Sequence, residues 1–319
     1  MVANTPRCKG EVTTKGTAYA TTKSPPSRRW PHRVIGVVSQ WGDNAAGQIM
    51  VKSYSVELSF LPGGVMHGRF VVSMLLGVIA LAAQAQDSRL DAVQKSGALR
   101  ICTPGDYKPF SLAKTDGTYE GLDVDLAQAM AKSLGVEAKF VKTSWPKLMD
   151  DFIDKCDICV GGISVTLDRQ KRAFFTDAYM VNGKAPITKC ENVKKFQTVA
   201  DIDKPNVTVI ENPGGSNERF ARANFKQAKI VIFNDNTVIF DEILKGNADV
   251  MISESVETIV QQKQRPGLCA VNPDKPLQYG EMAYLLPRGD VVFKAWVDQW
   301  LHLAKASGEY DRTLALWTK

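Results

Sequence analysis

Two glutamates, Glu254 and Glu257, lie three residues apart in the stretch DVMISESVETIV, just after an apolar run. Three-residue spacing at the start of a helix places both carboxyl groups on one side of that helix. There they can form a salt-bridged surface pair, hold polar groups of a bound ligand or donate a proton. A helix N-terminus favours the ionised form, so a proton donor also needs burial that raises its pKa. Spacing alone leaves the three interpretations open.

Polar and aromatic residues that suit ligand binding follow three predicted strands. They lie in TPGDYKPF, TSWPKLM and GGISVTLDR and are Asp106, Tyr107, Trp145, Ser164 and Arg169. An arginine after a strand-to-helix turn can hold a carboxylate through two hydrogen bonds, helped by a hydroxyl such as that of Ser164. The alternative for Arg169 is a surface arginine that pairs with Asp168.

The segment ENPGGSNERF places two glycines before a predicted helix whose N-cap we expect to be Ser216. Free backbone N–H groups and the helix dipole attract an anion there, and Gly214 and Gly215 allow its close approach. A plain tight turn accounts for the same residues. The segment is not a P-loop, because the Lys-Ser/Thr ending is missing.

Histidine-based catalysis finds little support. Beyond residue 85 the only histidine is His302, which lies inside a predicted helix. A Ser-His-Asp triad therefore cannot be assembled, and no H-E-x-x-H pattern occurs, so we expect no metal and no cofactor. The groups left for catalysis are carboxylates and lysine, together with the orientation in which the protein holds a ligand.

Five cysteines lie beyond residue 85, and an odd number leaves at least one thiol free unless it pairs between molecules. They are Cys102, Cys156, Cys159, Cys190 and Cys269. Cys156 and Cys159 have C-x-x-C spacing on a predicted strand, without a second cysteine pair or a nearby histidine. We expect buried thiols there rather than a zinc or redox site.

Short β-type runs alternate with amphipathic helices along the chain. The predicted strands include 98–104, 137–143, 156–164, 206–211, 229–233 and 248–253. The predicted helices are 121–135 with Gly135 as its stop, 145–155, 216–226, 236–246, 254–263 and a final helix over 291–308 that closes the chain. This alternation indicates parallel sheets covered by helices on both faces.

The alternation restarts beyond Cys190, which predicts two α/β lobes. We assign residues 86–183 plus 284–319 to lobe 1 and residues 184–283 to lobe 2, joined by two crossing strands. Ligands of open α/β sheets bind at the carboxyl ends of the strands, so we expect a cleft between the lobes.

The N-terminal part has the features of a targeting region. Residues 66–85 combine His67 and Arg69 with an apolar core and an Ala-Gln-Ala ending, as in a cleavable secretory signal peptide. A retained anchor is the alternative. We interpret residues 1–65 as a leader that is disordered or results from a start assigned upstream of Met66. Export to the periplasm follows, without stable membrane association after cleavage.

The formal charge of +6 comes from the first 85 residues, where nine Lys and Arg stand against three Asp and Glu. Beyond them, 31 basic residues balance 31 acidic ones. A neutral folded region gives no support to nucleic-acid binding. The sequence does not fix an oligomeric state.

The chain resembles the cyclohexadienyl dehydratases over about residues 88–317. The motifs that carry the resemblance are GDYKPF, GLDVDLAQAMAKSLG, TSWPKLM, GGISVTLDRQKRAFF, GKAPIT, NPGGSNERFARAN, ESVE and AYLLPRGD. GLDVDLA and GISVTLDR are shared by many non-catalytic receptors, whereas TSWP, NPGGSNE and ESVE together are narrower. The resemblance implies a periplasmic-binding-protein-like fold of type II, with a ligand cleft between two lobes and a two-strand hinge.

The resemblance also implies a secreted lyase that converts prephenate to phenylpyruvate, and arogenate to phenylalanine, by loss of water and carbon dioxide. Glu257 would be the general acid. Arg169, Ser164 and Lys184 would hold carboxylates, and Trp145 would form the wall against the ring. The remaining predicted contacts are Asp106, Asn212, Gly215, Asn217 and Glu254. A non-catalytic amino-acid receptor of an ABC transporter is the alternative function.

Cys190 and Cys269 are similar to a cysteine pair of that family, so the resemblance implies a disulfide between them. Cys102, Cys156 and Cys159 are then expected to remain thiols. Glu254 departs from the aspartate expected at its position, and the segment DKCDICVGG is one residue shorter than in the family. Neither departure involves Glu257.

Overall fold

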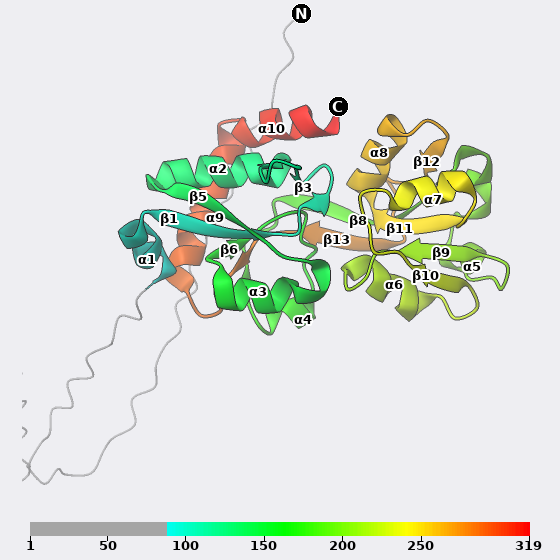
Figure 1. Cartoon of the computed structure of the whole chain (residues 1–319), viewed down its shortest axis with the longest axis horizontal. Coiled ribbons are helices and arrows are strands. Elements are labelled where there is room, and N and C mark those ends of the chain that lie inside the picture. Colours follow the sequence, from blue (N-terminus) through cyan, green and yellow to red (C-terminus); the bar gives the residue numbers. More distant parts are fainter. Residues whose placement is uncertain (1–87) are drawn as a thin grey trace, which may run out of the picture. The chain divides into compact units, whose positions relative to one another are not determined.

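The computed structural model describes residues 88–319, in which two β-sheets are each accompanied by helices (Figure 1). The predicted leader at 1–65 and the predicted signal peptide at 66–85 lie outside the described residues. Within residues 88–319, no helix combines the length and the apolar character that a membrane crossing needs.

The first sheet has the strand order β5-β1-β6-β14-β7. Its strands are β1 (Ala98–Thr103), β5 (Glu137–Lys142), β6 (Ile158–Cys159), β7 (Phe174–Phe175) and β14 (Leu285–Leu286). β5, β1 and β6 are parallel, as predicted, whereas β14 pairs antiparallel with both β6 and β7. The sheet is therefore mixed, because the chain returns to it through β14 in the opposite direction.

The helices around this sheet come from both ends of the described chain. They are α1 (Arg89–Ser96), α2 (Leu122–Leu134), the short 3-10 helix η1 (Trp145–Lys147), α3 (Leu148–Lys155), α4 (Leu167–Gln170), α9 (Val291–Ala306) and α10 (Glu309–Thr318). A small sheet of β2 (Asp106–Tyr107), β3 (Ser111–Ala113) and β4 (Tyr119–Glu120) follows β1.

The second sheet has the order β10-β9-β11-β8-β12, and β13 also pairs with β8. Its strands are β8 (Met180–Lys189), β9 (Thr208–Glu211), β10 (Lys229–Ile232), β11 (Val250–Glu254), β12 (Leu268–Ala270) and β13 (Gln278–Met282). Its helices are the 3-10 helix η2 (Cys190–Lys195), α5 (Val199–Ile202), α6 (Ser216–Asn224), α7 (Ile239–Lys245) and α8 (Ser255–Gln264). β10, β9 and β11 are parallel, and β8 runs antiparallel to β11.

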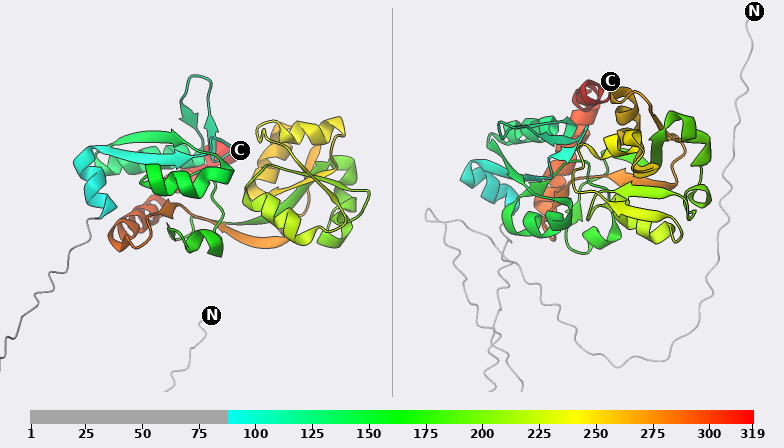
Figure 2. Two further views of the ribbon diagram at one scale, coloured as in Figure 1. Left: turned by 60° about the horizontal axis from the view of Figure 1, so that its bottom comes forward. Right: turned by 45° about the vertical axis from the view of Figure 1, so that its right-hand side comes forward.

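Two antiparallel strands, β8 and β13, form the predicted crossing connections (Figure 2). Residues 180–184 of β8 pair with residues 278–282 of β13. The chain enters β8 from the first sheet and leaves β13 toward β14 of that sheet. The lobe boundaries at 183/184 and 283/284 fall in this region and stay a prediction.

One buried carboxylate, Asp123 in the first turn of α2, ties both connections to the first sheet. It accepts hydrogen bonds from the backbone N–H groups of Gly161 and Gly162 at 2.9 and 2.7 Å. It also accepts from the hydroxyls of Tyr179, just before β8, and Tyr284, just before β14, at 2.8 and 3.2 Å. Burial nevertheless raises the pKa of Asp123 to about 6.

The helix predicted over 121–135 is α2, and Gly135 ends it in the left-handed conformation, as expected. The helix predicted over 291–308 is confirmed as α9 (Val291–Ala306), but the prediction that it closes the chain is wrong. α9 ends at Ala306, Gly308 adopts a φ of 73°, and a separate helix α10 begins at Glu309. A glycine with positive φ breaks the helical path here.

Two disulfides occur in the described residues. Cys190 and Cys269 are bonded with a Cα–Cα distance of 4.7 Å, which confirms the expected pair. Cys102 and Cys156 are also bonded, at a Cα–Cα distance of 5.7 Å, so the expectation that both remain thiols is wrong. Cys102 on β1 and Cys156 at the end of α3 become neighbours because α3 packs on β1. Cys159 is a buried free thiol.

Candidate active site

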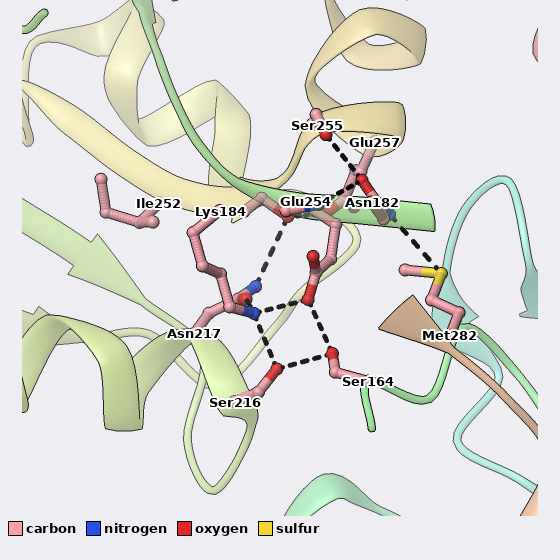
Figure 3. Close-up of polar contacts among 12 residues, drawn as sticks. Ser164, Asn182, Lys184, Ser216, Asn217, Ile252, Glu254, Ser255, Glu257 and Met282 are labelled. Carbon is pink, nitrogen blue, oxygen red and sulfur yellow. Dashed lines mark hydrogen bonds and ion pairs between the residues drawn. The ribbon is translucent and has the colours of Figure 1, made fainter. Parts of the chain in front are cut away.

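Glu254 and Glu257 are both buried at the start of α8, with 3% and 1% of their surface exposed. Glu254 is the N-cap residue and Glu257 lies in the first turn. This burial excludes the surface pair that the spacing left open. The two carboxyl groups also have different partners. Glu254 contacts Lys184 and Ser164 (Figure 3), whereas Glu257 accepts a hydrogen bond from the hydroxyl of Ser253.

Glu254 belongs to a buried polar cluster around Lys184. The Nζ of Lys184 donates to Glu254 Oε1 at 2.5 Å, to Asn217 Oδ1 at 2.5 Å and to Ser216 Oγ at 2.8 Å (Figure 3). Ser164 Oγ donates to the same Glu254 oxygen at 2.6 Å. An ammonium has three N–H donors, so all donors of Lys184 are engaged within the protein.

The cluster follows from the strand register. Glu254 on β11 is the direct partner of Lys184 on antiparallel β8, so their side chains lie on the same face of the sheet. Ser216 and Asn217 are the first residues of α6, which starts after β9. Ser164 comes from the loop after β6 and bridges to Met282 of β13.

Glu257 is a carboxyl group whose burial favours the protonated form. Burial, and then the nearby Asp106 and Glu254 charges, raise its pKa from an ordinary value of 4.5 to about 8. The hydroxyl of Ser253 donates to Oε2 and opposes this shift. Glu257 also lines a cavity of about 350 Å³ together with Asp106 and Asn236.

An aromatic wall lies beside these acids and is formed by Trp145 of η1 and Tyr107 of β2. The indole Nε1–H of Trp145 donates to Asp106 Oδ1 at 3.0 Å, and the Trp145 ring packs edge-on against Tyr107 at 5.5 Å between ring centroids. Burial raises the pKa of Asp106 to about 6. Within residues 88–319, the buried hydroxyl of Tyr107 has no partner at hydrogen-bond distance. Burial raises its pKa, the Glu257 and Glu254 charges add to this rise, and the nearby Ser253 hydroxyl opposes it.

Arg169 is 5% exposed and does not pair with Asp168, which pairs with Lys171 at 2.9 Å. The surface interpretation of Arg169 is therefore wrong. Its Nη1 donates to the carbonyl oxygen of Ser164 at 2.7 Å, while its buried Nη2 has no partner in the described residues. Burial, and then the nearby Arg219, lower the pKa of Arg169 to about 10.

The NPGG segment forms a turn whose N-cap is Gly215, not Ser216 as expected. Ser216 is instead the first helical residue, and its hydroxyl accepts from Lys184. The N–H of Gly214 is occupied by the Glu218 carboxylate at 2.6 Å, so a side chain of the helix itself takes the place predicted for an anion. A Cβ on Gly214 would lie 2.7 Å from Pro146.

A cavity of about 10 Å³, enough for about one water, lies among these groups. It is lined by Tyr107, Trp145, Gly162, Ser164, Asn212, Gly215, Ser216, Asn217, Asn236 and Glu254. The structure thus gathers most of the predicted ligand residues around one point. Lys184 contacts the cluster, Asp106 and Glu257 line the adjoining 350 Å³ cavity, and Arg169 lines a third one.

Three buried polar residues of this region were not predicted as site residues. Asn236 donates through Nδ2 to the carbonyl oxygen of Asp106 at 3.1 Å, and Ser253 contacts Glu257. Glu211 is fully buried beside Lys184 and Glu257, and burial raises its pKa well above the ordinary range. Glu211 and Ser253 lie at the ends of predicted strands, where a polar residue after an apolar run is a usable signal. Asn236 is the first residue of the helix predicted over 236–246, but it lies in the loop before α7, which begins only at Ile239.

The described residues contain no cluster of three or more His, Cys, Asp or Glu side chains suited to a metal. The alternation of α6, α7 and α8 with β9, β10 and β11 places the acids, amides and hydroxyls of the second sheet at its strand ends. A protonated Glu257 at these strand ends has a proton that it can donate, and the buried guanidinium of Arg169, on α4 beside the first sheet, can bind an anion.

Comparisons with known proteins identify relatives of this chain. The family model for bacterial extracellular solute-binding proteins, family 3, matches residues 99–319. Cyclohexadienyl dehydratase of Pseudomonas aeruginosa is 47% identical over 258 residues, which cover 81% of this chain and 96% of that protein. The L-cystine-binding protein TcyJ of Escherichia coli is 24% identical over 217 residues, 68% of this chain and 80% of that protein.

Solved structures show the same fold. An ancestral amino-acid-binding protein, described as a precursor of cyclohexadienyl dehydratase, has a TM-score of 0.67 and 34% identity, and covers 73% of this chain and 100% of its own. A binding component of an ABC transporter from Wolinella succinogenes, complexed with lysine, has a TM-score of 0.65 and 31% identity, and covers 70% of this chain and 96% of its own.

Proposed function

Because the chain belongs to the family 3 bacterial extracellular solute-binding proteins, and to the cyclohexadienyl dehydratases among them, we propose that it converts prephenate to phenylpyruvate and arogenate to phenylalanine. The observation that carries the proposal is Glu257, a buried carboxyl group whose pKa is raised to about 8. At neutral pH such a group holds a proton that it can donate.

The reaction needs one proton and a fixed pose. The bond between the ring and its carboxylate breaks, carbon dioxide leaves, and the electron pair of that bond enters the ring. The ring C–O bond breaks at the same time, and the departing hydroxide takes the proton of Glu257 and leaves as water. The ring becomes aromatic, and Glu257 regains a proton from solvent. General acid catalysis of this kind contributes roughly 10²- to 10⁴-fold.

The protein's other groups would hold the substrate. Arg169 is suited to a carboxylate because it is buried with an unpartnered Nη2 in the described residues. The Trp145 ring, held by Asp106 and packed against Tyr107, offers an aromatic wall for the substrate ring. Asn212, Gly215 and Asn217 contribute the contacts from the second sheet.

Binding of the substrate in the central cavity would require the two lobes to separate and close again. The central cavity of about 10 Å³ is far smaller than the roughly 300 Å³ or more of ligand pockets. Ser164 and Lys184 donate to Glu254 in this closed arrangement, so any contact of theirs with a substrate carboxylate replaces those bonds. Closure around the substrate would exclude water and bring Glu257 to the reacting hydroxyl.

The alternative, a receptor that hands an amino acid to a permease, has the same fold and the same use for Arg169. A receptor does not need a buried proton donor, whereas the dehydratase does. We also propose that residues 66–85 direct the protein to the periplasm. Membership of an extracellular family and two disulfides support this location.

The test is to incubate the purified protein with prephenate at neutral pH and to follow phenylpyruvate, with a control without protein because prephenate decomposes in acid. We expect catalysed product formation that Glu257→Gln lowers by roughly 10²-fold or more. No product from the unmodified protein would refute the enzyme function. Full activity of Glu257→Gln would refute the role of Glu257 as the general acid but not the enzyme function.

A further inference from the structure

The charge of Glu254 is neutralised inside the protein. Glu254 and Lys184 form an ion pair at 2.5 Å, and their side chains are 4% and 8% exposed. Ser164 supplies a further hydrogen bond to the same oxygen. A carboxylate at this position would attract the ammonium of an amino acid if its charge were free. Here Lys184 supplies the positive charge instead, so an ammonium gains little from Glu254.

Basic residues outnumber acidic ones around a third cavity, which also contains Arg169. Arg169, from the segment before β7, and Arg219, on α6, line one cavity of about 250 Å³. Three arginines and two acids line it, because Arg172, Asp150 and Asp168 also belong to the lining. Asp150 pairs with Arg172 at 2.6 Å and Asp168 with Lys171 at 2.9 Å, so neither acid forms an ion pair with Arg169 or Arg219. Within residues 88–319, neither Arg169 nor Arg219 has a carboxylate within ion-pair distance.

Two guanidinium groups that lie close together without an ion-paired carboxylate repel each other, although Glu254 near Arg169 and Asp168 near Arg219 offset part of this repulsion. An anion bound between the two groups would lower it further. The repulsion is visible in Arg169, whose pKa Arg219 helps to lower. Asp106 is the remaining acid near the ligand, but it lines the cavity beside Glu257 rather than the central one. The binding region is therefore arranged for negative charge.

We propose that Arg169, Arg219 and the neutralised Glu254 make the protein prefer prephenate to arogenate. The two substrates share both carboxylates and the ring hydroxyl. They differ in the side chain, where prephenate carries a keto oxygen and a net charge of −2, and arogenate carries an ammonium and a net charge of −1. This preference rests on the proposed function, and Arg219 is the specificity residue that it adds.

The experiment compares kcat/KM for the two substrates in the unmodified protein and in Arg219→Gln. We expect kcat/KM for prephenate to exceed that for arogenate by about tenfold or more. Arg219→Gln should lower kcat/KM for both substrates, and several-fold more for prephenate, because prephenate carries the larger negative charge. Arg222→Gln is the matched control, because Arg222 lies on the same helix, is exposed and pairs with Glu218. It should leave the ratio unchanged.

Lys184→Met tests the neutralised acid directly, since it leaves Glu254 without its cation and should shift the ratio toward arogenate. If Lys184→Met does not fold, the ratio of kcat/KM for the two substrates in the unmodified protein and in Arg219→Gln still tests the proposal. Equal values for the two substrates, or a preference for arogenate, would overturn the proposal. Equal losses of kcat/KM for prephenate and arogenate in Arg219→Gln would also overturn it.

A binding measurement separates this proposal from the proposed function. Titration calorimetry with the Glu257→Gln variant gives dissociation constants for both compounds without turnover. If neither compound is converted by the unmodified protein, the proposed function fails, and tighter binding of prephenate than of arogenate still supports the charge selectivity. Equal binding of the two compounds would refute the selectivity whether or not the protein is a dehydratase.

Discussion

Replacing Glu257 with glutamine should flatten the pH dependence of the protein's stability, because glutamine has nearly the shape of the carboxylic acid but does not ionise. Glu257 is buried, and its pKa rises from 4.5 to about 8 chiefly through that burial. The folded protein therefore holds this proton more tightly than the unfolded chain does. The resulting stabilisation is complete below about pH 4.5 and is lost as the pH rises through about 8.

The magnitude follows from the two pKa values. A tenfold difference in proton affinity corresponds to about 1.4 kcal/mol. At pH 6 the folded protein keeps the proton and the unfolded chain has lost it, whereas at pH 9 both are ionised. The free energy of unfolding of the unmodified protein should thus fall by about 3 kcal/mol more than that of Glu257→Gln between these pH values.

Urea denaturation at pH 6, 7, 8 and 9 measures this difference. Glu191→Gln, which changes an exposed glutamate, should follow the unmodified protein within about 0.5 kcal/mol at every pH. In the same pH range, kcat should decline above about pH 8 as Glu257 loses its proton. Parallel stability curves for the unmodified protein and Glu257→Gln would refute the raised pKa on which the role of Glu257 as an acid rests.

Three further results follow from the geometry. Gly214→Ala should lower kcat/KM by about tenfold or more, because its Cβ meets Pro146 across the cleft, whereas Gly117→Ala, with a similar φ and open space, should cost only about 1 kcal/mol of stability and leave kinetics unchanged. Equal kinetic losses would contradict the contact. Tyr107→Phe removes a buried hydroxyl that has no partner at hydrogen-bond distance within residues 88–319, so urea denaturation should show no loss of stability; a loss above about 1 kcal/mol would mean that the hydroxyl is bonded, for example to the nearby Ser253. Cys159 should react with iodoacetamide only after denaturation, and mass mapping that found it labelled in the native protein would refute its burial.

Local patterns predicted the site's elements well. The helix start that carries Glu254 and Glu257 was correctly placed, since it depends on an apolar run followed by helical spacing. The pair of Glu254 with Lys184 was not predicted, although both were expected near the ligand. It depends on the antiparallel register of β11 and β8, which are separated by 70 residues from Lys184 to Glu254. No local pattern contains that register.

The cysteines show the same limit. Cys190 and Cys269 were paired through the family resemblance, not through their spacing. The bond between Cys102 and Cys156 depends on how the end of α3 meets β1, and this is decided by packing of Leu148 and Phe152 in the core rather than by sequence distance. The buried state of Arg169 was likewise undecided by spacing, because a surface ion pair with its neighbour suited the sequence equally well.

The four hydrogen bonds to Asp123 have a mechanical consequence. The residues just before β8 and just before β14 are fastened to one carboxylate, so neither connection can slide along the first sheet independently of the other. Bending must then occur beyond Tyr179 on one strand and before Tyr284 on the other. Under a force that pulls the lobes apart, both strands would share the load at this one point. Asp123→Asn would weaken the hydrogen bonds that hold Tyr179 and Tyr284 together. We expect the two connections then to move more independently of each other, without any change to the residues of the cleft.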